Sequence, residues 1–176
     1  MDFKIQLPAD FSPEARAERA RNNFLNGYNC CQAVLLAFSD LLDGQASPEL
    51  LAVIGSGFGG GMARLREVCG SFSGAVVMAG FMSPADDPSV KSARTANYAL
   101  VQKMAAEFKE LNGGSIVCGE LLGLRKRAEV ENPEPSDRTP EYYGKRPCPQ
   151  IIYNSALVVA RNLLELAGTR SGDSEA

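Results

Sequence analysis

The chain has 176 residues, of which 45% are hydrophobic and 22% charged, a length and balance typical of one globular domain with a hydrophobic core. Its formal net charge of −3, its aromatic content of 7% and the absence of tryptophan argue against binding to nucleic acid or to anionic lipid. Histidine is also absent, which removes the commonest general base, the commonest metal ligand and any Ser/His or Cys/His catalytic pair.

The N-terminal segment has neither the basic start nor the apolar run of a secretory signal. Apolar stretches elsewhere are interrupted well short of a membrane span. We therefore expect a soluble cytoplasmic protein without membrane insertion, in a compartment where stable structural disulfides are rare. Five cysteines in such a protein are more typical of catalytic, redox or metal-binding roles than of structural cross-links.

Helix-start signals recur in the first third of the chain. Ser12-Pro13-Glu14 and Ser47-Pro48-Glu49 each place an N-cap residue before a proline at the first helical position. They predict a helix from residue 13 to about Leu25, ended by Gly27, and a short helix over PELLAVIG. Asn29 is expected to cap a helix between these two. The apolar face of that helix is formed by Ala33, Val34, Ala37, Phe38 and Leu41.

The rest of the chain also predicts helices and loops. A glycine-rich loop, GSGFGGGMAR, precedes a helix that begins near Cys69, and CGELLG forms a short helix. Asp87-Pro88 is expected to start the longest helix, which Asn112-Gly113-Gly114 closes. The charged, proline-rich segment 125–147 predicts a flap, and Pro147-Cys148-Pro149 opens a last helix with Gly168 as its C′ residue. Because no segment alternates with the period of a strand, we expect an all-α, single-domain helical bundle over residues 1–176.

Four of the five cysteines lie at or just before a predicted helix start: Cys30, Cys69, Cys118 and Cys148. A helix N-terminus carries partial positive charge and unpaired N–H groups, and both stabilise a thiolate. We therefore expect lowered pKa values and one shared reactive site. Neighbouring cations add to this expectation, namely Arg64 and Arg66 before Cys69, and Lys145 and Arg146 before Cys148.

Plainer interpretations of these residues stay open. A free cysteine often packs as a small buried hydrophobe, and Cys31 is better explained as an accessory neighbour of Cys30. Glu67 and Glu120 are candidates for proton transfer beside the cysteines, although exposed carboxylates favoured by the helix dipole are the more ordinary explanation. Arg64 is a further accessory candidate.

The glycine-rich run of residues 55–61 suggests a nucleotide-binding loop, but it lacks the Walker lysine and a preceding strand. A tight turn that brings the backbone close to the cysteines is the favoured interpretation. Binding of an anion or an oxidised substrate by its N–H groups is the alternative. Tyr142 and Tyr143, in the flap, either cover the site or anchor the loop.

Five segments, from residue 27 to about 152, carry a resemblance to a known family: GYNCCQAVLLAF, GFGGGMA, EVCGSFSG, GSIVCGELLG and RPCPQII. Together they resemble the redox-active protein family named for a C…CGAxxG…C…C cysteine signature. Its four cysteines fall on Cys30, Cys69, Cys118 and Cys148. Its CGAxxG motif reads CGSFSG here, with Ser71 at the alanine position, and Cys31 stands where members usually carry a small residue. The resemblance implies a redox role for the four thiols.

The leading hypothesis is thiol–disulfide exchange or electron transfer, as in an oxidoreductase, in which Cys69 attacks and a second cysteine resolves the mixed disulfide. Exchange requires no cofactor, and the partner is expected to be a redox protein or a small thiol or disulfide. One alternative is a zinc or iron–sulfur site with the same four cysteines as metal ligands. Another is a non-enzymatic helical interaction protein. The long amphipathic helix is compatible with a homodimer.

Overall fold

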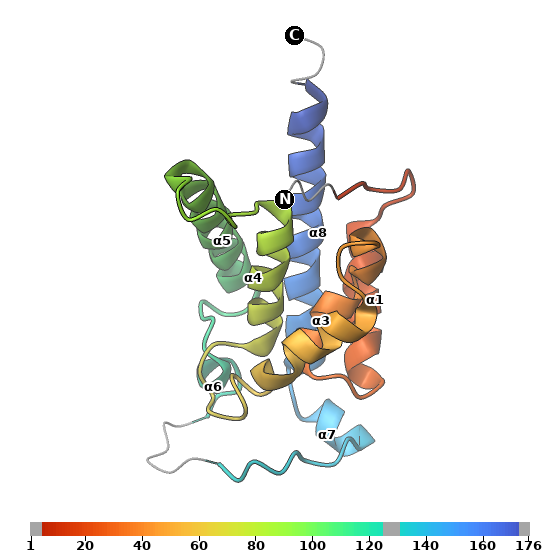
Figure 1. Cartoon of the computed structure of the whole chain (residues 1–176). Coiled ribbons are helices and arrows are strands. Elements are labelled where there is room, and N and C mark those ends of the chain that lie inside the picture. Colours follow the sequence, from red (N-terminus) through yellow and green to blue (C-terminus); the bar gives the residue numbers. More distant parts are fainter. Residues whose placement is uncertain (1–4, 125–130, 173–176) are drawn as a thin grey trace.

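The computed structural model describes residues 5–124 and 131–172, with side chains as far as residue 168. The part of the chain described is all-α and contains no strand (Figure 1). One isolated antiparallel bridge in this part pairs Val68 with Val117. The elements are α1 (Pro13–Leu25), α2 (Cys30–Leu36), η1 (Ser39–Leu42), α3 (Pro48–Gly55), η2 (Ser56–Phe58), α4 (Gly70–Met82), α5 (Lys91–Leu111), α6 (Cys118–Leu121), α7 (Pro140–Gly144) and α8 (Cys148–Gly172), where η marks a short 3-10 helix.

The predicted helix starts in the first third of the chain are confirmed by their caps. The Ser12 and Ser47 hydroxyls each accept the backbone N–H three residues later, at 3.2 Å, and proline occupies the first turn of α1 and of α3. Asn29 and Gln32 form a reciprocal capping box at the start of α2. Each cap satisfies N–H groups that a helix leaves unpaired, so these starts are fixed by local sequence.

The predicted second helix is split into two elements. α2 ends at Leu36, and the chain continues in η1 from Ser39. The carboxylate of Asp40 in η1 pairs with Arg16 at 2.5 Å and with Arg19 at 2.8 Å, both on α1. The predicted apolar face is nevertheless buried throughout, across α2 and η1 together.

Two later predictions about helices are wrong. α5 begins at Lys91 rather than at Pro88, because Asp87 accepts hydrogen bonds from the N–H and the hydroxyl of Ser89 and holds this segment in a turn. The longest helix is α8, with 25 residues against 21 in α5. α8 also continues through Gly168, which is therefore not a C′ residue.

The core forms around α8, which is flanked by α1 on one side and by α4 and α5 on the other (Figure 1). Small residues permit close contact between α1 and α8: Ala17 and Ala20 on α1 and Ala156 and Ala160 on α8 are all fully buried. Burial of these apolar faces supplies the main favourable term in folding. None of the helices described is both long enough and apolar enough to cross a membrane.

One end of the bundle gathers the segments that carry cysteines. α4 and α8 both begin there, and α6 and α7 lie at the same end (Figure 1). Of the predicted flap, residues 125–130 lie outside the described residues, and residues 131–147 form a loop interrupted by α7. The Tyr143 hydroxyl donates to the carbonyls of Phe24 and Leu25 at 3.2 and 3.3 Å. Tyr143 therefore anchors this segment to the end of α1.

Candidate functional site

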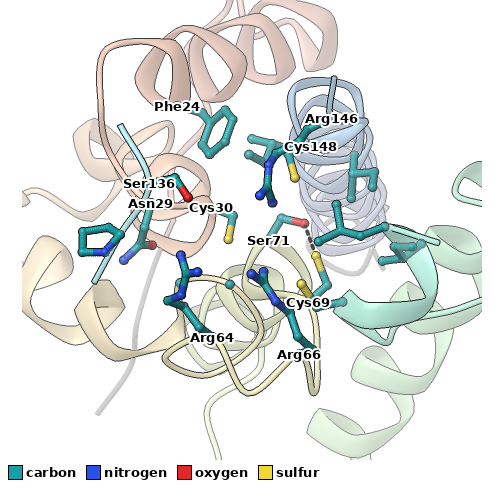
Figure 2. A pocket seen from close by; sticks show the side chains of 18 of the residues that line it. Phe24, Asn29, Cys30, Arg64, Arg66, Cys69, Ser71, Ser136, Arg146 and Cys148 are labelled. Carbon is teal, nitrogen blue, oxygen red and sulfur yellow. Dashed lines mark hydrogen bonds between the residues drawn. The ribbon is translucent and has the colours of Figure 1, made fainter. Parts of the chain in front are cut away.

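Four elements bring one cysteine each to a single pocket. Cys30 and Cys148 are the first residues of α2 and α8, Cys69 is the N-cap of α4, and Cys118 is the first residue of α6. All four line a pocket of about 380 Å³, and the four thiols are free. Figure 2 shows the sulfurs of Cys30, Cys69 and Cys148 around one space. We call this space the cysteine pocket.

Cys30 lies against the glycine-rich loop and the start of α4. Its sulfur accepts a hydrogen bond from the backbone of Gly60. A Cβ atom added to Gly70 would lie 2.7 Å from the Cys30 Sγ and would also overlap the carbonyl oxygen of Phe58. Real Cβ atoms do not approach other atoms this closely, so the sulfur reaches this position because residue 70 is glycine.

Cys69 lies next to the only hydroxyl described in contact with a pocket sulfur. Its Sγ is 3.3 Å from the Ser71 Oγ in a buried contact. The Cys69 side chain makes no capping hydrogen bond to α4, so the predicted contact between this sulfur and the helix N–H groups is absent. The Ser71 carbonyl accepts the Ser155 hydroxyl at 2.8 Å, which joins the start of α4 to α8.

Cys118 is held against the same loop from the other side. Its N–H donates to the Glu67 carbonyl at 2.6 Å, next to the Val68–Val117 bridge. A Cβ atom added to Gly61 would lie 2.6 Å from the Cys118 Cβ. Gly61 also has a φ of +70°, a conformation that side chains disfavour. The interpretation of the glycine-rich run as a turn that approaches the cysteines is therefore confirmed.

The pKa values of three pocket thiols contradict the expected lowering. Burial raises the pKa of Cys30 to about 12 and that of Cys148 to about 11, and it also raises the pKa of Cys118. A buried thiolate loses its hydration, and this cost exceeds the help from nearby hydrogen bonds and cations. For Cys118 that help comes from a hydrogen bond and the charge of Arg66. Position at a helix start therefore does not decide the ionisation of these three thiols.

Cys69 is electrostatically central to the group. After burial, the strongest influence on the pKa of Cys30, of Cys118 and of Cys148 is in each case the negative charge of Cys69, which raises it. Like charges in one pocket disfavour each other. A negative charge on Cys69 would therefore oppose ionisation of the other three pocket thiols.

The charged side chains that line the cysteine pocket are all cationic. Arginines from the glycine-rich loop and from the flap line it: Arg64, Arg66, Arg138 and Arg146. The Arg138 guanidinium stacks over the Phe24 ring at 4.7 Å, and that of Arg146 over the Tyr142 ring at 4.6 Å. Tyr142 lines the pocket while Tyr143 anchors the flap, so the two roles weighed for this tyrosine pair divide between them.

Four residues singled out in the sequence lie elsewhere. Glu67 and Glu120 are exposed, and neither lines the cysteine pocket. Glu120 accepts the Ser115 hydroxyl at 2.5 Å, which makes it a local contact at the start of α6. Cys31 is fully buried in the core, and Lys145 is exposed on a neighbouring groove.

Sequence reasoning missed the part of Ser71 and of Arg138 in this site. Ser71 was noted only as a small residue in a motif, whereas its hydroxyl contacts the Cys69 sulfur. Arg138 belongs to a segment with many charges, and a charge in such a segment looks the same whether it faces solvent or a pocket. Its neighbours Pro135 and Pro140, which restrict the backbone, were the nearest signal of a fixed conformation.

Among the described residues, no group of three or more cysteine, aspartate or glutamate side chains has an arrangement that could hold a metal ion. Metal analysis of the purified protein decides whether the four cysteines bind zinc or an iron–sulfur cluster.

The fold and the site define an all-helical protein with a pocket lined by four free cysteines from four elements. The model of the family described as "Putative redox-active protein (C_GCAxxG_C_C)" matches residues 28–162, well over half of the chain. The chain belongs to this family. Membership supports a redox role in general terms, in agreement with the resemblance found in the sequence.

The matched region contains all four pocket cysteines and the glycine-rich loop. The family name spells its motif with glycine before cysteine, whereas this chain reads Cys69-Gly70-Ser71. A search of curated proteins found no match, and neither did a search of solved structures.

Proposed function

We propose that this protein carries out thiol–disulfide exchange in the cysteine pocket, with Cys69 as the attacking thiol. The observation that carries the proposal is the convergence of four free cysteines, widely separated in the sequence, on one pocket. Cysteines that only filled core space would not need to share a cavity with cations. Cys31, which is buried outside the pocket lining, illustrates that packing role.

The reaction consumes one disulfide and two protein thiols. The Cys69 thiolate attacks one sulfur of a substrate disulfide, so that a Cys69–substrate bond forms, the substrate S–S bond breaks and one substrate thiolate leaves. A second pocket cysteine then loses its proton and attacks the Cys69 sulfur, which releases the other substrate thiolate. The substrate is reduced by two electrons, and the two cysteines are oxidised to a disulfide.

We propose Cys30 as the resolving cysteine. Its sulfur is held against Gly70, the residue directly after Cys69, and the charge of Cys69 is the strongest charge acting on it. Its raised pKa keeps it protonated during the first attack. Formation of the mixed disulfide removes the Cys69 charge, which makes ionisation of Cys30 easier for the second step.

The test is a single oxidation of the reduced protein followed by peptide mapping. One equivalent of 2,2′-dithiodipyridine is expected to release two thiopyridone molecules and leave one disulfide among the pocket cysteines. Cys30→Ser should stop at a mixed disulfide on Cys69, and Cys69→Ser should lose the fast reaction. Cys31→Ser is the matched control, since it removes the neighbouring thiol from outside the pocket. Random labelling of all five cysteines would contradict the proposal.

Two further measurements decide between this function and its alternatives. Anaerobic purification with metal analysis and a visible spectrum tests for a zinc or iron–sulfur site. If Cys69→Ser releases a bound metal and unfolds the protein, the sulfur is a structural ligand. Alkylation rates in folded and unfolded protein test the non-enzymatic alternative, because inert packing thiols react only after unfolding.

A further inference from the structure

The cysteine pocket carries a concentration of positive charge that the four thiols alone do not explain. Four arginines line it, and no aspartate or glutamate does so among the described residues. Figure 2 shows the side chains of Arg64, Arg66 and Arg146 directed towards the space between the labelled sulfurs. Thiol chemistry on a neutral substrate needs no such concentration of guanidinium groups.

Two of these arginines have no carboxylate partner within the described part of the chain. Arg138 and Arg146 instead lie over aromatic rings, Arg138 over Phe24 and Arg146 over Tyr142. Cation–π contacts fix the orientation of a guanidinium group while leaving its N–H donors free to bind an anion. The structure thus holds two oriented, uncompensated cations at the pocket.

The other two arginines share a single carboxylate. Arg66 binds Glu131 through two nitrogens, at 2.8 and 2.5 Å, and Arg64 binds it at 3.0 Å. Glu131 lines the neighbouring groove rather than the cysteine pocket. The Arg64 Nε atom is buried and has no hydrogen-bond partner, although a buried donor left unpaired is costly. A donor in this state favours an acceptor supplied by a ligand.

The pocket is also partly apolar and larger than an inorganic anion. Its volume of about 380 Å³ lies within the range of sites for small organic molecules. Apolar side chains of Leu121, Leu122, Ile151 and Ile152 share the lining with the arginines and cysteines. The combination suits an organic molecule with an apolar body and a carboxylate.

Building on the proposed exchange function, we propose that the substrate is a small organic disulfide that carries carboxylate groups, which the pocket arginines bind. Arginine presents paired N–H donors that match the two oxygens of a carboxylate. Binding of the carboxylate places the substrate S–S bond beside Cys69, and holding reactants together in this way accelerates attack. The exchange then proceeds as described above, with two protein thiols oxidised and the disulfide reduced to two thiols.

The test compares two aromatic disulfides that differ in charge. 5,5′-Dithiobis(2-nitrobenzoate) carries two carboxylates, whereas 2,2′-dithiodipyridine is neutral near pH 8. Stopped-flow absorbance gives the rate constant of the first thiol with each reagent, and their ratio reports recognition of the carboxylate. Changes in thiol reactivity affect both rates and cancel in this ratio.

The double variant Arg138→Gln/Arg146→Gln is expected to lower the ratio about tenfold or more, the factor for losing one charge-assisted hydrogen bond. Arg94→Gln/Arg161→Gln, at exposed positions on α5 and α8 outside the pocket lining, is the control matched for net charge and should leave the ratio unchanged. Arg138→Gln/Arg146→Lys should lose less of the ratio than Arg138→Gln/Arg146→Gln but should stay below the wild-type value. Lysine keeps the charge of arginine but not its paired donors. An unchanged ratio in the double variant overturns the proposal.

A second measurement needs no substitution and covers a variant that does not fold. In the wild-type protein, 3-nitrobenzoate should slow the reaction of the first thiol with the neutral disulfide, and 3-nitrobenzamide should not. Equal effects of the two compounds overturn the carboxylate proposal. If neither disulfide leaves an intramolecular disulfide, the exchange function fails, yet the rate ratio still decides whether the pocket recognises carboxylates.

Discussion

The Sγ atom of Cys30 occupies space that a Cβ atom at Gly70 would fill, at a separation of 2.7 Å. A glycine at the start of α4 thus lets a sulfur on α2 pack against the residue that follows Cys69. This relationship explains in physical terms why a glycine directly follows Cys69, and it makes the cysteine pocket sensitive to a single methyl group.

Gly70→Ala is expected to lower the free energy of unfolding by about 1–3 kcal/mol, the range for an added group in a packed site. It should also slow the formation of the pocket disulfide, because the Cys30 sulfur must move. Gly80→Ala on the same helix is the control, since nothing lies within 4 Å of its added Cβ atom. That variant should gain about 0.5–1 kcal/mol from helix propensity. Urea unfolding measures both, and equal effects at the two positions would refute the steric argument.

Gly61→Ala is expected to displace Cys118 as well as to strain the backbone. Gly61 and Gly113 have φ values of +70° and +74°, so alanine at either position costs about 1–2 kcal/mol in backbone strain. A Cβ atom added to Gly61 would lie 2.6 Å from the Cys118 Cβ and 2.9 Å from the Glu67 carbonyl oxygen, whereas nothing lies within 4 Å of one added to Gly113. Mass spectrometry after alkylation of the folded protein should therefore show changed labelling of Cys118 in Gly61→Ala and unchanged labelling in Gly113→Ala.

The raised pKa of Cys148 predicts a loss of stability at high pH. In the unfolded chain this thiol loses its proton near its ordinary pKa of 9.0, whereas burial in the folded chain raises that pKa to about 11. Between these values the unfolded state binds fewer protons, so the free energy of unfolding falls as the pH rises. The contribution is complete below pH 9 and is lost as the pH passes 11.

Cys148→Ala should flatten this dependence. The titrations of tyrosines and lysines are common to both proteins, so the difference between variant and wild type reports Cys148 together with its effect on Cys30. Urea unfolding at a series of pH values measures the two slopes. Parallel curves between pH 9 and 11 would show that Cys148 ionises as easily in the folded chain as in the unfolded one.

The parts of the fold that local sequence decides could be predicted, and the parts that tertiary contact decides could not. Ser12 and Ser47 act on N–H groups three residues away, so their helices start where expected. The thiol pKa values depend on burial by segments far along the chain, and the helix-start argument gave the wrong direction for Cys30. The carboxylate of Asp87 accepts a hydrogen bond from Ser89, and α5 begins only at Lys91. Turn and helix compete at this position, and the residue types alone do not predict which one forms.

The four cysteines were found from their positions, but the cations around them were found only in part. Arg64 and Arg66 stand close to Cys69 in the sequence, and both line the pocket. Arg138 is ten residues from Cys148 and reaches the pocket only because the flap turns back along the end of α1, where its guanidinium meets Phe24. A contact of this kind between distant segments cannot be predicted from the spacing of residues in the sequence.

Tyr143→Phe tests whether the flap is held in place by its anchor on α1. The substitution removes the hydroxyl that donates to the Phe24 and Leu25 carbonyls, but it keeps the ring that packs edge-on against Phe24 at 5.5 Å. We expect a loss of about 1 kcal/mol in local stability, the net value of an ordinary hydrogen bond. Hydrogen exchange should therefore become faster in residues 131–147, while exchange in α8 should stay slow, since opening of the flap does not require global unfolding.

Tyr142→Phe provides the matched control one residue away, because the Tyr142 hydroxyl makes no hydrogen bond with the residues described. The contacts of the Tyr142 ring with Arg138 and Arg146 survive the change. Exchange in the flap should match that of the wild type. The flap carries Arg138 and Arg146, so its loosening in Tyr143→Phe should also lower the preference for the dicarboxylate disulfide over the neutral one. Faster exchange without a change in this preference would mean that the two arginines act independently of the anchor. Equal exchange rates in Tyr143→Phe and Tyr142→Phe would mean that the Tyr143 hydroxyl does not hold the flap.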